Sequence, residues 1–316
     1  MKHFLSPKET RPAWYLYLVS IVFVLIGLFS FSVTLIGLIY ASKGEIDPGT
    51  SQEEVLGRFN NNQLFVINMI PFVIGFLLLF YAARIIHRRK FLSFITTRPQ
   101  LDLKRIAVGL LIWGIITAIL FSAELAQGAT QYKWNFEMND FILLLILSIA
   151  IVPIQTGFEE ILIRGFTMQL FGRFVKLPIV TVLMSAGIFL ILHLGNPEVD
   201  SMGYVALVYY LLSGIMTAII AVMDDGLELS WGFHIANNFF AILIVTSDTN
   251  ALRTDAVYLD TSAPQAMGLE TLIVPVLFFP LFVFILSRIY RWKNWKGKLF
   301  QPIQPHVEPN KEDLLD

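Results

Sequence analysis

The most regular feature of the sequence is a succession of long apolar runs separated by short polar segments. Runs of this length are typical of helices that cross the hydrocarbon core of a bilayer. The eight runs cover residues 14–40, 64–86, 106–127, 141–170, 178–194, 203–223, 229–247 and 271–290. Trp14, Tyr40 and Tyr290 lie at run ends, as aromatic residues do at membrane interfaces. The pattern predicts an all-α fold, a polytopic transmembrane helical bundle of about eight spans.

Composition sharpens this picture because it excludes a soluble domain. Of the 316 residues, 56% are hydrophobic and only 15% are charged, which is typical of a polytopic membrane protein. Cysteine is absent, so the chain offers no disulfide, no thiolate ligand for zinc and no cysteine nucleophile. We expect membrane lipid to be a partner and nucleic acid not to be one.

Charge is distributed unevenly among the segments that connect the runs. The segment 43–63 is net acidic, whereas the next connection is strongly basic. The cations of that connection are Arg84, Arg88, Arg89, Lys90, Arg98, Lys104 and Arg105. Basic connections stay on the cytoplasmic side, so both termini are expected there. The turn at 224–228 is an exception, because it falls on the same side and carries Asp224, Asp225 and Glu228.

The same pattern divides the chain into three parts. Residues 1–139 hold about three spans and the basic connection, 140–250 hold the candidate catalytic core, and 251–316 hold an outer connection, the last span and a tail. The tail, Gln301–Asp316, lacks apolar periodicity, which predicts disorder. The first apolar run is too long for a signal peptide. We expect an integral protein of a bacterial cell membrane.

Few charged or imidazole side chains lie within the apolar runs, where each is costly. The candidates are Glu159, Glu160, Arg164, His193, His234 and Asn238. Neighbours on a helix point about 100° apart, so the two glutamates face different ways. Glu160 can pair with Arg164, four residues on, whereas Glu159 shares its face with Ile163 and has no such local partner. Glu159 is therefore left for another helix or for water, unless the motif is only a surface pair at a helix end.

His193 ends the run that follows a basic turn. The path from Glu159 to Gly172 is roughly 20 Å, and the path from Pro178 to His193 is roughly 22 Å, at about 1.5 Å per helical residue. In an antiparallel hairpin the two side chains would therefore reach similar heights. Phe189 lies one turn before His193 and can pack against its ring. The alternative is an interfacial histidine without chemistry.

His234 and Asn238 are four residues apart and project from one face of their helix. Lipid offers them no partner, so they require a polar group on another helix. Hydrogen bonding between helices is the alternative to a catalytic role. Glu124, near the outer end of its run, is interpreted as interfacial and is left out of the site.

One carboxylate, two imidazoles and one amide can activate water in two ways. Glu159, His193 and His234 could hold zinc, which lowers the pKa of its bound water. Alternatively, Glu159 and His193 hold and deprotonate the water, while His234 and Asn238 stabilise the oxyanion. The H-E-x-x-H pattern of many zinc proteases is absent, and the sequence leaves both mechanisms open.

Three short motifs, in this order, resemble the CAAX protease and bacteriocin-processing (CPBP) family of intramembrane endopeptidases, which includes the type II CAAX prenyl endopeptidases. The motifs are Glu159-Glu160-x-x-x-Arg164, Phe189-x-x-x-His193 and His234-x-x-x-Asn238. The resemblance covers about residues 140–247 and implies a protease within the membrane.

The resemblance also implies a role for each motif residue. Glu159 would be the general base, and His193 would help to hold the water. His234 and Asn238 would form the oxyanion site, and the adjacent glutamate–arginine pair would support them. The expected substrate is a membrane-associated protein or peptide.

Two other classes of function compete with this expectation. A non-catalytic protein of the bacteriocin-immunity type could bind a peptide through the same polar cluster. A small transporter is disfavoured, because neither an internal repeat nor a matching pair of broken helices is evident.

Overall fold

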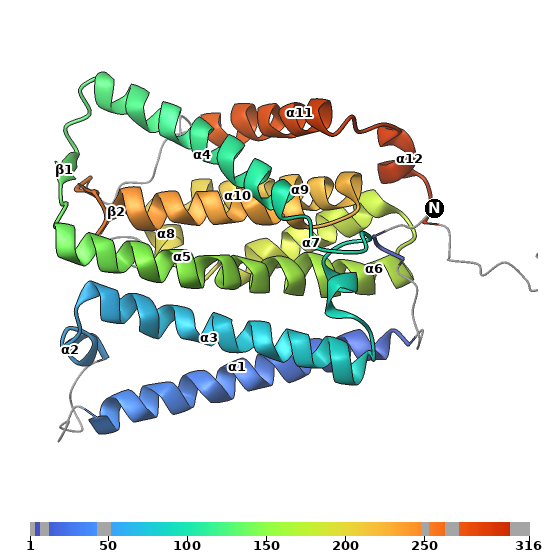
Figure 1. Ribbon diagram of the computed structural model, residues 1–316, viewed down its shortest axis with the longest axis horizontal. Helices are drawn as coiled ribbons and strands as arrows, with labels where there is room; N and C mark the ends of the chain where they lie inside the picture. Colours follow the sequence, from blue (N-terminus) through green and yellow to red (C-terminus); the bar gives the residue numbers. More distant parts are fainter. Residues whose placement is uncertain (1–3, 7–12, 43–51, 248–252, 263–271, 304–316) are drawn as a thin grey trace, which may run out of the picture.

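The computed structural model describes residues 4–6, 13–42, 52–247, 253–262 and 272–303. Helices dominate this part of the chain (Figure 1). The first half contains α1 (Tyr15–Ser42), α2 (Gln52–Leu56), α3 (Asn61–Tyr81), η1 (Ala82–Ile86), η2 (Phe91–Phe94), α4 (Leu103–Ala126) and α5 (Met138–Glu160). The second half contains η3 (Ile161–Thr167), α6 (Met168–Phe174), α7 (Pro178–Leu192), α8 (Pro197–Met202), α9 (Tyr204–Asp224), α10 (Glu228–Phe239), η4 (Phe240–Ile244), η6 (Val274–Phe278), α11 (Phe279–Ile289) and α12 (Trp295–Phe300).

The predicted all-α transmembrane bundle is confirmed. Among the described residues, five helices are long and apolar enough to cross a membrane. They cover Tyr15–Ala41, Asn61–Ile86, Leu103–Ala126, Met138–Phe174 and Tyr204–Asp224. Two shorter apolar helices, Pro178–Leu192 and Val274–Ile289, match two further predicted spans.

The predicted span at 229–247 differs from the others. It forms α10 and η4, and nearly every side chain from Glu228 to Ala236 is buried. This helix is enclosed by other helices and does not face lipid along that stretch. Its burial removes the need for a purely apolar surface, which is why it can carry His234 and Asn238.

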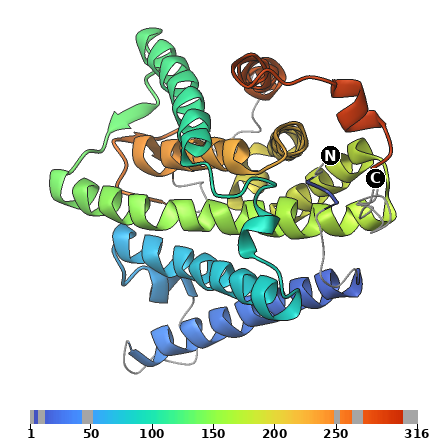
Figure 2. The same cartoon turned by 45° about the vertical axis from the view of Figure 1, so that its right-hand side comes forward.

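The helix α5 forms the centre of the bundle, and α6 continues along the same line (Figure 1). Helix α3 packs on one side of α5, with α1 beyond it, and α10 packs on the other side. Beyond α10 lies α4, and Figure 2 keeps the same order of layers. Helices α6 and α7 form a hairpin and contact each other, and α7 also packs against α9.

Glycine permits the closest of these contacts, between α4 and α10. A Cβ atom on Gly232 would collide with the backbone carbonyl oxygen of Ile106, and one on Gly109 would collide with that of Leu229. The two backbones therefore touch where neither residue has a side chain. This contact fixes the position of α10, which carries two of the predicted site residues.

A small sheet closes one end of the bundle, and the sequence pattern did not predict it. Strand β1 (Tyr132–Trp134) pairs antiparallel with β3 (Tyr258–Asp260), which pairs parallel with β2 (Val245–Ser247). The sheet lies at the end opposite α12 (Figure 1). Predicted features that fall on residues 248–252, 263–271 and 304–316, including most of the tail, lie outside the described residues.

The acidic turn between α9 and α10 is neutralised by the basic segments. Arg98 donates to Asp224 at 2.8 Å and to Glu228 at 3.0 Å, and Arg105 also pairs with Asp224. These four residues form what we call the ion-pair network. It joins the segment before α4 to the start of α10, and it explains how acidic residues can share one end of the bundle with the basic connection.

Candidate active site

Glu160 is fully buried, and each of its oxygens has a partner. Arg164 Nη1 lies 2.8 Å and His234 Nδ1 lies 3.1 Å from its Oε1 atom. The Ser230 hydroxyl donates to its Oε2 atom at 2.8 Å. The predicted pairing of Glu160 with Arg164 is therefore confirmed, and it lies in the protein interior, not at an exposed helix end.

The helix changes its winding directly after Glu160. Residues Ile161–Thr167 form a π-helix, and the Thr167 hydroxyl bonds to the carbonyl oxygen of Leu162, five residues earlier, at 2.8 Å. Such segments are rare and are frequent at functional sites. Here the π-helix carries Arg164, whose guanidinium carbon lies 4.6 Å from the ring centre of Phe189 on α7. The altered winding therefore aims the arginine at both Glu160 and the neighbouring helix.

Glu159 has a different environment from its neighbour. Its Oε1 atom accepts a hydrogen bond from Gln155 Nε2 at 2.7 Å, and its Oε2 atom lies 3.4 Å from His234 Nε2. The side chain remains 15% exposed, whereas that of Glu160 is fully enclosed. The expectation that Glu159 has no local partner was wrong, because Gln155 lies four residues before it on the same face.

His193 comes directly after α7 and is placed by aromatic packing. Its Nδ1 atom lies 2.7 Å from the Phe189 carbonyl oxygen, and its ring packs on Phe189 and Tyr210 with centroids 4.3 and 4.4 Å apart. The predicted contact with Phe189 is confirmed. The Phe189 ring also lies 6.2 Å, centroid to centroid, from the ring of His234. One aromatic ring therefore lies next to both histidines, and the hairpin places His193 on the side of α7 that faces His234.

His234 and Asn238 both face α5, in agreement with the predicted shared face. The two ring nitrogens of His234 face one glutamate each. Asn238 Nδ2 donates to Gln155 Oε1 at 2.9 Å. Asn238 thus reaches Glu159 through the amide of Gln155, and α10 contacts both glutamates of α5.

The zinc site considered from the sequence does not fit this arrangement. Among the described residues, no three His, Asp or Glu side chains are grouped closely enough to hold a metal ion. We therefore derive no step from a metal ion held by Glu159, His193 and His234.

Three residues that the sequence analysis missed complete the site. Gln155 bridges Glu159 and Asn238, Ser230 bonds to Glu160, and Tyr210 covers His193. Gln155 and Ser230 each lie four residues before a predicted site residue, so helical spacing could have found them. Tyr210 comes from α9, and no sequence spacing indicated it.

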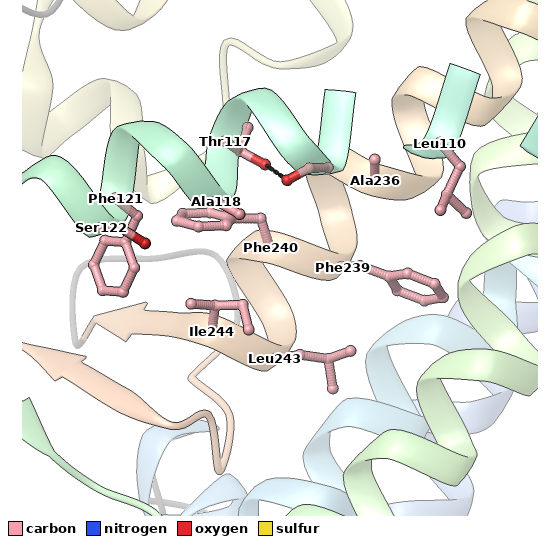
Figure 3. A pocket seen from close by; sticks show the side chains of 11 residues that line it. Leu110, Thr117, Ala118, Phe121, Ser122, Ala236, Phe239, Phe240, Leu243 and Ile244 are labelled. Atoms are coloured by element: carbon pink, nitrogen blue, oxygen red, sulfur yellow. Dashed lines mark hydrogen bonds between the residues drawn. The ribbon is translucent and has the colours of Figure 1, made fainter. Parts of the chain in front are cut away.

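The opposite face of α10 is apolar. A groove of about 290 Å³ lies between α4 and the segment α10–η4 (Figure 3). Its lining includes Leu110, Phe121 and Phe240 and none of the six predicted site residues. Thr117, also in the lining, bonds to the carbonyl oxygens of Trp113 and Gly114 on its own helix. The predicted site residues His234 and Asn238 therefore lie on the face of α10 toward α5, away from this groove.

The fold and these contacts define an integral membrane protein with a buried acid–base cluster. Residues 138–240 match the family model for "Type II CAAX prenyl endopeptidase Rce1-like". This segment is therefore similar to the type II CAAX prenyl endopeptidases, which confirms the resemblance of the three motifs and supports the intramembrane protease class. The matched residues include all six predicted site residues.

Further comparisons add one relative. The chain is 32% identical over 166 residues to the "Uncharacterized protein YyaK" of Bacillus subtilis (strain 168). The alignment covers 52% of this chain and 56% of the relative, so the chain spans about half the length of the curated relative it matches. No solved structure matches the chain.

Proposed function

We propose that the protein is an intramembrane endopeptidase in which Glu159 activates water. The observation that carries this proposal is the contrast between two adjacent carboxylates. Glu160 is enclosed and paired with Arg164, whereas Glu159 is partly exposed and faces an imidazole and an amide. A carboxylate that keeps access to water while other groups hold its orientation suits a general base.

The proposed reaction needs only groups that this chain supplies. Glu159 takes a proton from a water molecule held between its carboxylate and His193, and the water oxygen bonds to the substrate carbonyl carbon. The carbonyl electrons move to oxygen, and His234 Nε2 and the second amide hydrogen of Asn238 stabilise the resulting oxyanion. When the C–N bond breaks, Glu159 returns the proton to the leaving nitrogen. The products are a carboxylic acid and an amine, and the acid then gives its proton to the amine, which leaves a carboxylate and an ammonium group.

The position of His234 supports its proposed role. Its Nδ1 atom lies 3.1 Å from Glu160 and its Nε2 atom lies 3.4 Å from Glu159, so the ring is held between the two carboxylates. The shorter contact is with the enclosed Glu160, which fixes the ring from its Nδ1 side. The Nε2 side is therefore the one that faces the partly exposed Glu159 and the proposed reaction.

The proposed substrate is a membrane-associated protein or peptide, because the cluster is built from helices of a membrane bundle. Proteomic comparison of membranes from cells with the wild-type protein and with Glu159→Gln tests this assignment. A substrate should accumulate uncleaved in the variant, and a synthetic peptide spanning its cleavage site should be cut by the purified wild-type protein alone. Identical membrane proteomes, with no cleavage by purified protein, would favour the alternative of a non-catalytic, immunity-type peptide binder.

We further propose a bacterial cell membrane as the location, with both termini cytoplasmic. The basic segments that flank the spans support this orientation. Since the chain has no cysteine, single cysteines introduced at Lys90 and Lys133 can be labelled without background. An impermeant maleimide should label position 133 in intact cells and position 90 only after lysis. The reverse pattern would refute the orientation.

A further inference from the structure

Gln155 occupies a central position in the cluster that the family motifs do not include. It lies on α5, one turn before Glu159, and is 5% exposed. Its Nε2 atom donates to Glu159 Oε1 at 2.7 Å, and its Oε1 atom accepts from Asn238 Nδ2 at 2.9 Å. The Gln155 amide therefore joins the Glu159 carboxylate, on its own helix, to the Asn238 amide on α10.

The chemistry of the groups fixes the direction of this chain of hydrogen bonds. An ionised carboxylate only accepts, so the NH2 group of Gln155 must face Glu159. The carbonyl oxygen of Gln155 must then face Asn238, which can satisfy it only by donating from its own NH2 group. The ionised Glu159 thereby dictates how the amide of Asn238 is turned, two hydrogen bonds away.

We infer that Gln155 is a positioning residue that couples the orientation of Asn238 to Glu159. This inference rests on the proposed function and deepens it. With Asn238 held by Gln155, one of its amide hydrogens is committed and the other is directed at the place where the oxyanion forms. The base and one oxyanion donor are thus arranged as a unit before substrate binds, which is the preorganisation that electrostatic catalysis requires.

The packing of α5 on α10 does not depend on Gln155 alone. The Trp231 indole donates to the Pro153 carbonyl oxygen at 2.9 Å, and the Ser230 hydroxyl donates to Glu160 at 2.8 Å. These two bonds hold α10 against α5 independently of the amide. A Gln155→Met variant, which keeps the length and shape of the side chain, should therefore keep the fold and lose only the coupling.

The first test needs no substrate. The infrared carboxylate band of Glu159 is identified as the band missing from the Glu159→Gln variant. Asn238→Ala should shift this band in the wild-type background and leave it unchanged in the Gln155→Met background, because the connection has been removed. A shift of equal size in both backgrounds, or in neither, would overturn the coupling. This test can support or overturn the coupling even if the proposed protease activity is absent.

The second test uses cleavage of the peptide identified by the proteomic comparison. Gln155→Met should lower kcat by about 10- to 100-fold, the effect of losing one hydrogen bond to a charged group, and change KM by less than about twofold. The double variant Gln155→Met/Asn238→Ala should be no slower than the slower single variant, because both changes break one unit. If the two single variants' effects on kcat multiplied in the double variant, or if only KM changed, a positioning role would be contradicted.

A matched control is available in the same protein. Gln169 is also buried, and its Oε1 atom accepts a hydrogen bond from Arg89 Nη2 at 3.2 Å, away from the glutamates. Gln169→Met removes a buried amide without touching the cluster. It should leave the Glu159 band unshifted and kcat within about twofold of the wild-type value, after correction for the folded fraction. An equal loss of kcat in both glutamine variants would show that removing any buried amide lowers activity, whether or not it contacts Glu159.

Discussion

Two buried charge clusters contact α10, and their carboxylates have different kinds of partners. At the start of α10, the ion-pair network gives Asp224, the last residue of α9, two arginines and gives Glu228 one. Farther along, α10 faces two glutamates of α5, of which only Glu160 has a guanidinium partner. Glu159 meets His234 and an amide. One helix therefore contacts one cluster in which the carboxylates are neutralised and one in which a carboxylate is left available.

This difference shows how a structural cluster can be told from a reactive one. Charges that are paired with guanidinium groups cannot accept a proton without breaking those bonds. Glu159 is held by an amide and an imidazole, and its side chain remains 15% exposed. The distinction rests on the partners of each carboxylate, and it predicts that substitutions in the two clusters affect different properties.

The largest expected effect is on activity, in Glu159→Gln. Loss of the proposed base should lower kcat by about 1,000-fold or more, while the unfolding temperature stays close to that of the wild type, because glutamine keeps the shape. Peptide cleavage and thermal unfolding in detergent measure the two quantities. Glu124→Gln, on an exposed glutamate of α4 that accepts from Tyr132, is the matched control and should remain active. If the Glu159→Gln variant remained active, the distinction between the neutralised carboxylates and the available one would not identify the base.

The next effect is on stability, in Arg164→Leu. This change leaves Glu160 buried without its cation, which should cost about 3–5 kcal/mol, as measured by unfolding in detergent. Arg173→Leu, a partly exposed arginine near the end of the same helix, should cost much less. Equal costs for the two variants would mean that burial of the pair is not what makes it important.

The sequence predicted the bundle well where hydropathy alone decides the outcome. The run predicted at 106–127 became Leu103–Ala126, and it starts earlier because Asp102 caps the first turn by accepting from the Lys104 and Arg105 backbone amides. Hydropathy could not show that the helix from Glu228 is enclosed by protein, because lipid and protein interiors favour similar side chains. The sheet escaped prediction because β1 and β3 pair across more than 100 residues.

The sequence predicted the residues of the site more fully than the hydrogen bonds that join them. The pairing of Glu160 with Arg164 followed from helical spacing, and the hairpin that carries His193 followed from the turn between two apolar runs. The bridge through Gln155 was missed because charged groups and histidines are the side chains that contrast with an apolar run. An uncharged amide gives no comparable signal in an apolar run, and the partner of its carbonyl oxygen comes from a helix about 80 residues later.

A buried histidine outside both clusters sharpens the comparison, because its nearest charged neighbour is an arginine that opposes its protonation. His87 is 2% exposed and lies 3.1 Å from the Ser20 hydroxyl. Burial, and then nearby Arg89, lower the pKa of His87 to about 4. The unfolded chain binds the proton near pH 6.5, so the contribution to stability is complete above that pH and is lost as pH falls toward 4.

The expected loss is up to about 3 kcal/mol between pH 6.5 and 4, measured as unfolding at a series of pH values. His87→Phe keeps the aromatic contacts with Tyr17 and Phe94 and should flatten this part of the curve. An unchanged slope in the variant would assign the acid sensitivity to the carboxylate clusters instead.

The smallest effect is expected in the ion-pair network, in Arg98→Met. Burial raises the pKa of Glu228 and Arg98 opposes that rise, so without the arginine Glu228 can take up a proton and avoid an unpaired charge. Asp224 still keeps Arg105, and the Arg98 side chain is itself 21% exposed. The variant should therefore lose only about 1–2 kcal/mol.

Glu228→Gln in the same background should recover part of that loss, since it removes the need for the proton, and kcat should stay within about twofold of the wild type. Unfolding and peptide cleavage measure both quantities in one preparation. If Arg98→Met lowers kcat as far as Gln155→Met does, then the start of α10 helps to position Asn238. The two clusters would in that case act as one unit, and the distinction between a neutralised and an available carboxylate would no longer separate structure from catalysis.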